Sequence, residues 1–108
     1  MKVVTIGKYS PAGREALAEA TIEQRRAAMD KVYAALGGKV TDYFWCDGEH
    51  DFVIVAEVPD KAAVTGMNNN AIASGSVESL IVCAEVDASR LTEAQRTARD
   101  TFSSITDC

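Results

Sequence analysis

Apolar and β-branched residues gather in short runs along the chain, and longer amphipathic stretches separate most of these runs. Each run has the length and composition of a β-strand. The predicted strands cover residues 2–9, 39–46, 50–58 and 77–86. Ser10-Pro11-Ala12-Gly13 should end the first strand. Only Asp47-Gly48-Glu49 separates the second strand from the third, so these two are expected to form a hairpin.

A helix is predicted between the first and second strands, with its start at Thr21. Thr21 and Gln24 have the spacing of a capping box, in which each side chain bonds to the backbone amide of the other residue. Gly37-Gly38 should end this helix. Residues 14–20 are compatible with a helix but do not require one. The apolar positions of the predicted helix share one face and are Ile22, Met29, Val32, Tyr33 and Leu36.

A second helix is predicted between the third and fourth strands. Asp60 is a good N-cap for it, and Gly75 lies near its end. Asn68, Asn69 and Asn70 compete for backbone hydrogen bonds in its second half. These asparagines either face a polar pocket against the sheet or mark a frayed stretch in solvent, and the second interpretation is favoured.

The order of elements is β-α-β-β-α-β followed by a C-terminal helix. That last helix is predicted to start at a second capping box, Thr92 with Gln95, and to run to about Ser103. The order is typical of the ferredoxin-like arrangement, or split βαβ. Right-handed crossovers place both inner helices on one face of an antiparallel sheet with the strand order 4-1-3-2. We therefore expect one α+β domain over residues 1–108.

The third and fourth strands carry apolar residues on both of their faces. Phe52, Ile54, Ala56 and Val58 oppose Val53 and Val55, and Leu80, Val82 and Ala84 oppose Val77, Ile81 and Cys83. A sheet that helices cover on one face only should instead alternate apolar and polar residues. A second copy of the chain, packed sheet against sheet, is therefore expected to complete a homodimer or a larger assembly.

Residues 36–60 read LGGKVTDYFWCDGEHDFVIVAEVPD, and residues 5–13 read TIGKYSPAG. Both stretches resemble the GYD domain family, which is named after a Gly-Tyr-Asp signature. The resemblance covers about residues 2–86, and His50 stands where the signature has Tyr. The resemblance implies the dimeric α/β-barrel group of ferredoxin-like folds, and it implies no particular activity.

The charge balance and the cysteines narrow the class of protein. A formal net charge of -5 disfavours binding to nucleic acid. No basic run suggests a membrane surface, and the N-terminus lacks the features of a signal peptide, so a cytoplasmic location is expected. The 3 cysteines form no paired spacing, which argues against a disulfide framework. Cys46 and Cys83 are expected to be buried in strands, and Cys108 is the last residue.

His50 is the only histidine, and it lies at the mouth of the predicted hairpin. An imidazole that titrates near neutral pH is a natural general base, so His50 is the candidate catalytic residue. A hydrogen-bonded structural role is the favoured alternative. Asp51 cannot orient the ring directly, because adjacent strand residues point to opposite faces. Cys46 and His50 lack the paired spacing of a zinc site, so neither a metal nor a cofactor is expected.

Aromatic residues form the other candidate cluster. Tyr43 and Trp45 share one face of the second strand, and Tyr9 ends the first strand. Tyr9, Trp45 and Asp51 are the candidate ligand-binding residues of an aromatic pocket, although core or interface aromatics would produce the same pattern. The favoured hypothesis is a small-molecule-binding homodimer that could act as a cofactor-free enzyme on a small organic substrate. The alternative is a non-catalytic oligomerisation or regulatory module.

Overall fold

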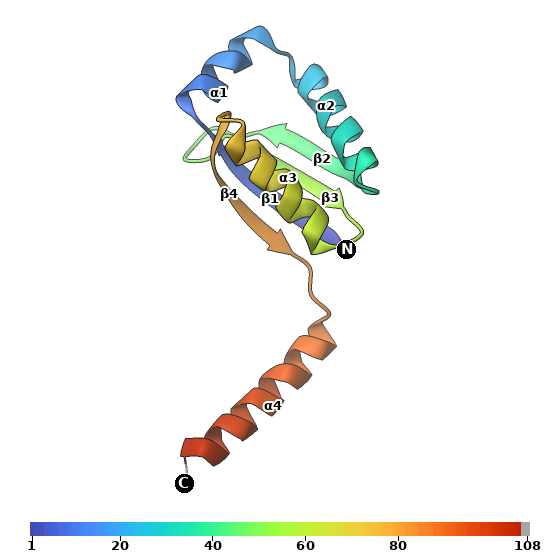
Figure 1. Cartoon of the computed structure of the whole chain (residues 1–108), viewed down its shortest axis with the longest axis vertical. Helices are drawn as coiled ribbons and strands as arrows, with labels where there is room; N and C mark the ends of the chain where they lie inside the picture. The colour runs from blue at the N-terminus through green and yellow to red at the C-terminus, as the bar shows by residue number, and fades with distance from the viewer. Residues whose placement is uncertain (107–108) are drawn as a thin grey trace.

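The computed structural model in Figure 1 describes the backbone of residues 1–106 and the side chains as far as Phe102. The elements in chain order are β1 (Lys2–Tyr9), α1 (Pro11–Ala16), the 3-10 helix η1 (Leu17–Glu19), α2 (Ile22–Ala35), β2 (Lys39–Trp45), β3 (Phe52–Glu57), α3 (Lys61–Ala73), β4 (Val77–Ala84) and α4 (Ala88–Thr106). The predicted β-α-β-β-α-β order with a C-terminal helix is confirmed, and α1 and η1 are additions to it.

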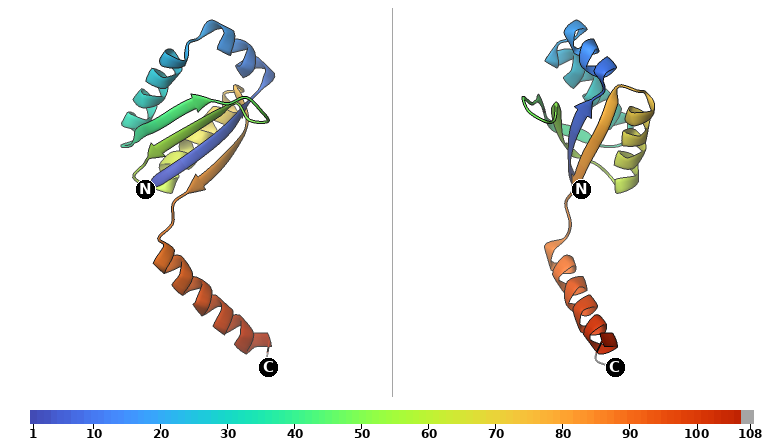
Figure 2. Two further views of the ribbon diagram at one scale, coloured as in Figure 1. Left: turned by 180° about the vertical axis from the view of Figure 1, so that it is seen from behind. Right: turned by 90° about the vertical axis from the view of Figure 1, so that its left-hand side faces the viewer.

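The strands form one antiparallel sheet in the order β2-β3-β1-β4. The predicted ferredoxin-like order, with the first and third strands in the centre, is confirmed. α2 and α3 pack on the same face of this sheet, because side chains from both helices join the core that the sheet forms there. The left view of Figure 2 shows the other face, which no described helix covers.

α2 and α3 begin at the residues that the capping signals predict. Thr21 Oγ1 accepts a hydrogen bond from the Gln24 amide at 3.1 Å, and the Gln24 side chain accepts one from the Thr21 amide at 2.9 Å. Gly37 follows the end of α2 with a φ of 83°, a conformation that favours glycine. Asp60 caps α3 through its side chain. Local sequence thus fixes where both helices of the covered face begin.

α4 begins earlier than the capping box at Thr92 and Gln95 predicts. Asp87 Oδ1 accepts a hydrogen bond from the Arg90 amide at 2.9 Å, whereas the Thr92 hydroxyl donates to the Ala88 carbonyl inside the helix. The predicted start at Thr92 is wrong because an aspartate upstream already satisfies the first free amides. The helix also continues beyond its predicted end.

Two further segments differ from their predictions. Ser10-Pro11-Ala12-Gly13 does not only end the first strand but also starts α1, because the Ser10 hydroxyl accepts from the Gly13 amide and proline suits the first helical position. α3 runs through its three asparagines without a break, so the frayed-helix interpretation is wrong. Asn69 is exposed, whereas Asn68 is half-buried on the side toward the sheet.

The core lies between the covered face of the sheet and the two helices. Its buried apolar side chains are Val3, Tyr9, Tyr33, Val40, Tyr43, Phe52, Ile54, Ala56, Val58, Val64 and Val77. Val77 was expected on the opposite face, with Ile81 and Cys83, and that prediction is wrong. The pairing of β1 with β4 shifts between Lys8 and Tyr9, and this irregularity brings Val77 opposite Tyr9.

The uncovered face of the sheet is apolar across neighbouring strands. We call it the open face, and its apolar members are Val4, Ile6, Phe44, Val53, Val55, Ile81 and Cys83. Phe44 is 44% exposed and Ile81 is 45% exposed. Cys83 is exposed on this face, so the prediction that it is buried is wrong, whereas Cys46 is half-buried. Cys108 lies outside the described residues.

α4 extends away from the sheet in every view of Figures 1 and 2. The chain therefore measures 63 Å along its longest axis against 28 and 24 Å along the others. Leu91 and Phe102 are exposed on this helix. Within residues 1–106, none of the helices combines the length and the apolar character that crossing a bilayer requires.

Candidate functional site

A cavity of about 240 Å³ lies between the covered face of the sheet and the helices α2 and α3. Most of its wall is apolar, and its apolar side chains include Met29, Phe52, Ile54, Met67, Val77 and Leu80. These residues come from α2, β3, α3 and β4, so the cavity exists only when the two helices are docked on the sheet. Thioether side chains in such a wall can adapt to the shape of a ligand.

Hydroxyl groups and an indole form a polar chain at one side of the cavity. Trp45 Nε1 donates a hydrogen bond to the Tyr43 hydroxyl at 3.0 Å, and the Tyr43 and Tyr9 hydroxyl oxygens are 3.5 Å apart. Tyr9 and Tyr43 both line the cavity. Burial raises the pKa of Tyr9, and the neighbouring Tyr43 hydroxyl raises it further. The Tyr9 phenol therefore stays protonated near neutral pH and can donate a hydrogen bond.

The aromatic part of the wall depends on a glycine in β1. Gly7 pairs with Phe52 across the sheet, and a Cβ atom at position 7 would overlap the Phe52 ring. The absent side chain lets this ring lie over the strand. The Phe52 and Tyr9 rings are 4.9 Å apart with planes tilted by 42°. Gly7 thus sets the position of both aromatic rings in the cavity wall.

Three buried side-chain polar atoms of the described chain have no hydrogen-bond partner, and those on Thr5 and Asn68 belong to residues that line the cavity. The three atoms are Thr5 Oγ1, Tyr33 Oη and Asn68 Oδ1. Burial raises the pKa of Tyr33, and the nearby Thr5 hydroxyl offsets part of that effect although the two groups lack the geometry of a hydrogen bond. Such groups cost about 1–3 kcal/mol each when unsatisfied, and they commonly accompany binding sites.

Arg25 of α2 also lines the cavity. Its positive charge opposes the rise in the pKa of the Tyr9 phenol, and Arg25, Tyr9 and Tyr43 line the same cavity. The side chain is half-buried, and no ion pair joins it to another described residue. Arg25, Tyr9 and Tyr43 thus add one charged and two phenolic groups to a lining that is otherwise mostly apolar.

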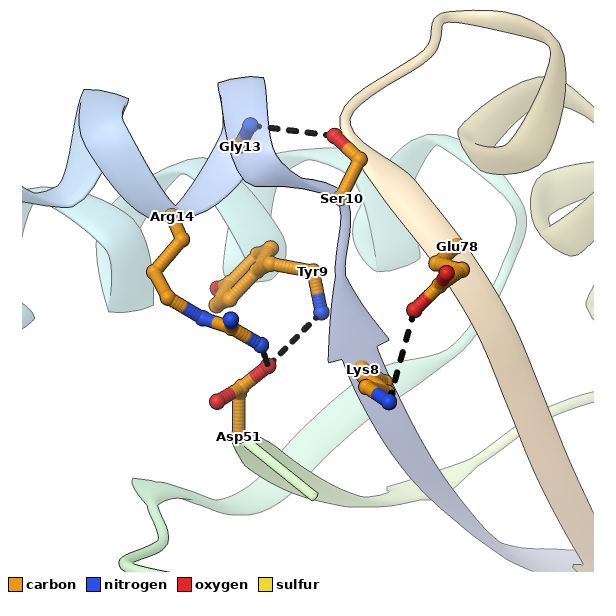
Figure 3. Close-up of polar contacts among 7 residues, drawn as sticks. All are labelled: Lys8, Tyr9, Ser10, Gly13, Arg14, Asp51 and Glu78. Atoms are coloured by element: carbon orange, nitrogen blue, oxygen red, sulfur yellow. Dashed lines mark hydrogen bonds and ion pairs between the residues drawn. The ribbon is translucent and has the colours of Figure 1, made fainter. Parts of the chain in front are cut away.

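Asp51 connects the hairpin to the end of β1, as Figure 3 shows. Asp51 Oδ2 accepts a hydrogen bond from the Tyr9 amide at 2.8 Å and forms an ion pair with Arg14 Nη2 at 3.1 Å. Burial pushes the pKa of Asp51 upward, but the Tyr9 amide, Arg14 and Lys8 outweigh it and hold the pKa below its usual range. Lys8 itself pairs with Glu78 of β4 at 3.5 Å.

The predicted site residues are only partly brought together. Tyr9 lines the cavity, and Trp45 reaches it through its hydrogen bond to Tyr43. Asp51 holds the backbone of Tyr9, and half-buried His50 lies at the hairpin mouth outside the lining of the cavity. The catalytic role of His50 and the ligand-binding roles of the others remain predictions. Among the described residues, no cluster of histidine, cysteine and acidic side chains could hold a metal ion.

The sequence interpretation missed Arg25 and Thr5, and for Asn68 it considered a pocket against the sheet but favoured solvent. A signal for Arg25 exists in the sequence, because it lies between Ile22 and Met29 on the apolar face of α2, at the spacing where a core residue is expected. Thr5 sits in the buried alternation of β1, where its polar side chain departs from the pattern. The asparagine run left the direction of Asn68 open, since that direction depends on how α3 docks on the sheet.

The sheet order and the helix-covered face define an α+β protein with ferredoxin-like topology. Residues 3–98 match the model of the GYD domain, so the chain belongs to the GYD domain family. That family is of the dimeric α/β-barrel type. The predicted family is confirmed. Comparison with curated proteins gave no match.

Proposed function

We propose that the protein is a homodimer that binds a small organic molecule in the cavity between its sheet and its helices. The observation that carries this proposal is a cavity of about 240 Å³ with apolar walls and a few convergent polar groups. Binding sites for small molecules have this composition. The volume is below the usual range for drug-sized ligands, so the ligand is a small compound.

The polar region of the cavity favours binding through donated hydrogen bonds. The protonated Tyr9 phenol is a donor, and Tyr43 is held beside it by Trp45. A catalytic step would need a group that gains or loses a proton near neutral pH at the ligand. His50 is the candidate for that step, and it would have to act from the hairpin mouth.

The open face supports the homodimer. An apolar sheet face of this kind is costly to expose to water, and it marks an interaction surface. A second copy is the occupant we propose, because the chain belongs to a family of the dimeric barrel type and its open face would meet an identical apolar face. The free thiols of Cys46 and Cys83 favour a reducing compartment, in agreement with a cytoplasmic protein.

The open face equally supports a second candidate function, a non-catalytic oligomerisation or regulatory module. Both candidates share the dimer, and they differ only in whether the cavity takes a ligand. A variant that fills the cavity but leaves the open face unchanged therefore separates them.

A thermal-shift screen of small carbonyl, phenolic, quinone and carboxylate compounds tests the proposed function. A compound present at a hundredfold above its dissociation constant adds about 2.7 kcal/mol to the stability of the native state. Ala71→Leu places a larger side chain in the cavity wall and should abolish the shift. Ala73→Leu, at an exposed position of the same helix, should retain it. If Ala71→Leu binds every hit as well as wild type, the cavity is not the ligand site.

A further inference from the structure

We propose that the ligand of this cavity is a small organic carboxylate, whose carboxylate group pairs with Arg25 while its apolar body occupies the space between sheet and helices. This inference rests on the proposed function and adds the chemical class of the ligand. Of the residues that line the cavity in the described part of the chain, Arg25 alone carries a charge.

The position of Arg25 on α2 is unusual for a charged side chain. Ile22 precedes it and Met29 follows it on the face of the helix that packs toward the sheet. Apolar residues normally occupy such positions, because burying an unpaired charge is costly. A guanidinium kept in an apolar wall is stabilised when an anion pairs with it there.

The arginines nearest to Arg25 in the folded domain have carboxylate partners, whereas the exposed Arg90 and Arg96 of α4 have no ion pair with another described residue. Arg26, the next residue, pairs with Asp30 at 3.4 Å, and Arg14 pairs with Asp51 at 3.1 Å. The chain has 16 acidic residues against 11 lysines and arginines, so acidic side chains are in excess. Arg25 nevertheless has no ion-pair partner among the described residues, and its guanidinium keeps its full set of donors for a ligand.

The groups around Arg25 suit a carboxylate in particular. The planar guanidinium matches the two oxygens of a carboxylate, and Tyr9 and Tyr43 line the same cavity with their hydroxyls. These hydroxyls are 3.5 Å apart, which is a long contact between themselves, so each can form a shorter bond to an anionic oxygen. A phosphate group carries more negative charge than the single arginine of the lining can balance, so a carboxylate is the better match.

The apolar walls define the rest of the ligand. Phe52, Met67 and Leu80 offer contact to a ring or a short alkyl chain. The cavity volume of about 240 Å³ limits this body to a small group. Benzoate and phenylacetate have the required combination of one carboxylate and one ring.

Isothermal titration calorimetry with matched compounds tests the inference on the full chain. The probes are benzoate and phenylacetate, their neutral amides benzamide and phenylacetamide, and phenyl phosphate. Wild type should bind at least one carboxylate at least tenfold more tightly than the corresponding amide. Arg25→Gln should remove this preference. Arg26→Gln is the matched control, since it removes the neighbouring charge outside the cavity and should keep the preference.

Thermal melting of the unliganded variants separates ligand binding from a structural role. Because Arg25 pairs with no described carboxylate, Arg25→Gln should leave the melting temperature unchanged or raise it. Equal binding of carboxylates and amides, or loss of the preference in both variants, would overturn the inference and leave the proposed function standing. Tighter binding of phenyl phosphate than of both carboxylates would assign the site to phosphate esters instead. Failure of every probe at millimolar concentration would overturn the inference, whereas the proposed function fails only if no compound of the thermal-shift screen binds.

Discussion

The Asp51 carboxylate accepts a hydrogen bond from the backbone amide of Tyr9, with 2.8 Å between Oδ2 and the nitrogen. The two residues are 42 positions apart in the sequence. Their bond joins the mouth of the β2–β3 hairpin to the end of β1, where the ring of Tyr9 enters the cavity wall. The aspartate of the family signature therefore has a structural function in this chain: it fixes the backbone that carries a cavity residue.

Removal of the Asp51 side chain should destabilise the protein. Asp51→Ala leaves the partly buried Tyr9 amide without its acceptor, which should lower the free energy of unfolding by about 1–3 kcal/mol. Arg14→Ala removes only the ion pair, and because the Arg14 side chain is 54% exposed it should cost less than about 1 kcal/mol. Urea denaturation of both variants measures the difference. Equal losses of unfolding free energy in the two variants would show that the ion pair with Arg14, and not the hydrogen bond from the Tyr9 amide, provides the stabilisation.

The charge of Asp51 should make part of the stability depend on pH. Its folded pKa lies below the ordinary aspartate value of about 3.9, so the folded state favours the ionised carboxylate. The resulting stabilisation is complete above about pH 5 and disappears as the pH falls through the lower folded pKa. The difference in unfolding free energy between wild type and Asp51→Asn should therefore be largest near pH 7 and shrink toward pH 2–3. A difference that grows on acidification would contradict the lowered pKa.

Substitution of Gly7 by alanine should disturb the cavity wall more than the small size of the added methyl group suggests. Gly7→Ala places a methyl group where the Phe52 ring lies, and overpacking of this kind typically costs about 1–3 kcal/mol. Gly66→Ala is the matched control, since nothing lies near that position and alanine favours the interior of α3 by up to about 1 kcal/mol. Chemical denaturation should show opposite signs for the two variants. A stabilising Gly7→Ala would mean that the ring moves freely.

The fold could be predicted from local signals because each signal acts over a few residues. Thr21 with Gln24 and Asp60 cap the helices as their positions in the sequence suggest. Strand alternation placed most side chains on the correct face. The error at Val77 arose from the irregular pairing near Tyr9, which a period-2 pattern cannot reveal.

The cavity was harder to predict because it depends on how distant elements dock. Tyr9 and Tyr43 could be proposed as a cluster, since the sheet order places their strands β1 and β2 on either side of β3. Asn68 comes to the cavity only through the placement of α3 on the sheet. The start of α4 shows a different limit, because Asp87 and Thr92 are both good N-caps and local sequence does not decide between them.

The open face should control assembly. Ile81→Glu puts a carboxylate on the open face, in the proposed dimer interface, and should shift the protein to the mass of one chain, 11.5 kDa, in light scattering. Ile72→Glu on α3 is a matched control, because Ile72 is 43% exposed and Ile81 is 45% exposed. The control should remain a dimer. If wild type itself has the mass of one chain at micromolar concentration, the proposed homodimer is wrong.

His50 can be tested against Tyr9 once a ligand of the cavity is found. His50 is half-buried at a hairpin mouth, so His50→Ala should leave the dimer folded with little change in melting temperature. Because His50 does not line the cavity, its loss should change the ligand dissociation constant less than twofold. Tyr9→Phe removes a hydroxyl that faces the cavity and should weaken binding by roughly tenfold. Calorimetry on both variants, with melting curves as the folding control, gives the comparison. The opposite pattern, with binding or turnover lost in His50→Ala at an unchanged melting temperature, would assign the chemistry of the site to the histidine that replaces the signature tyrosine.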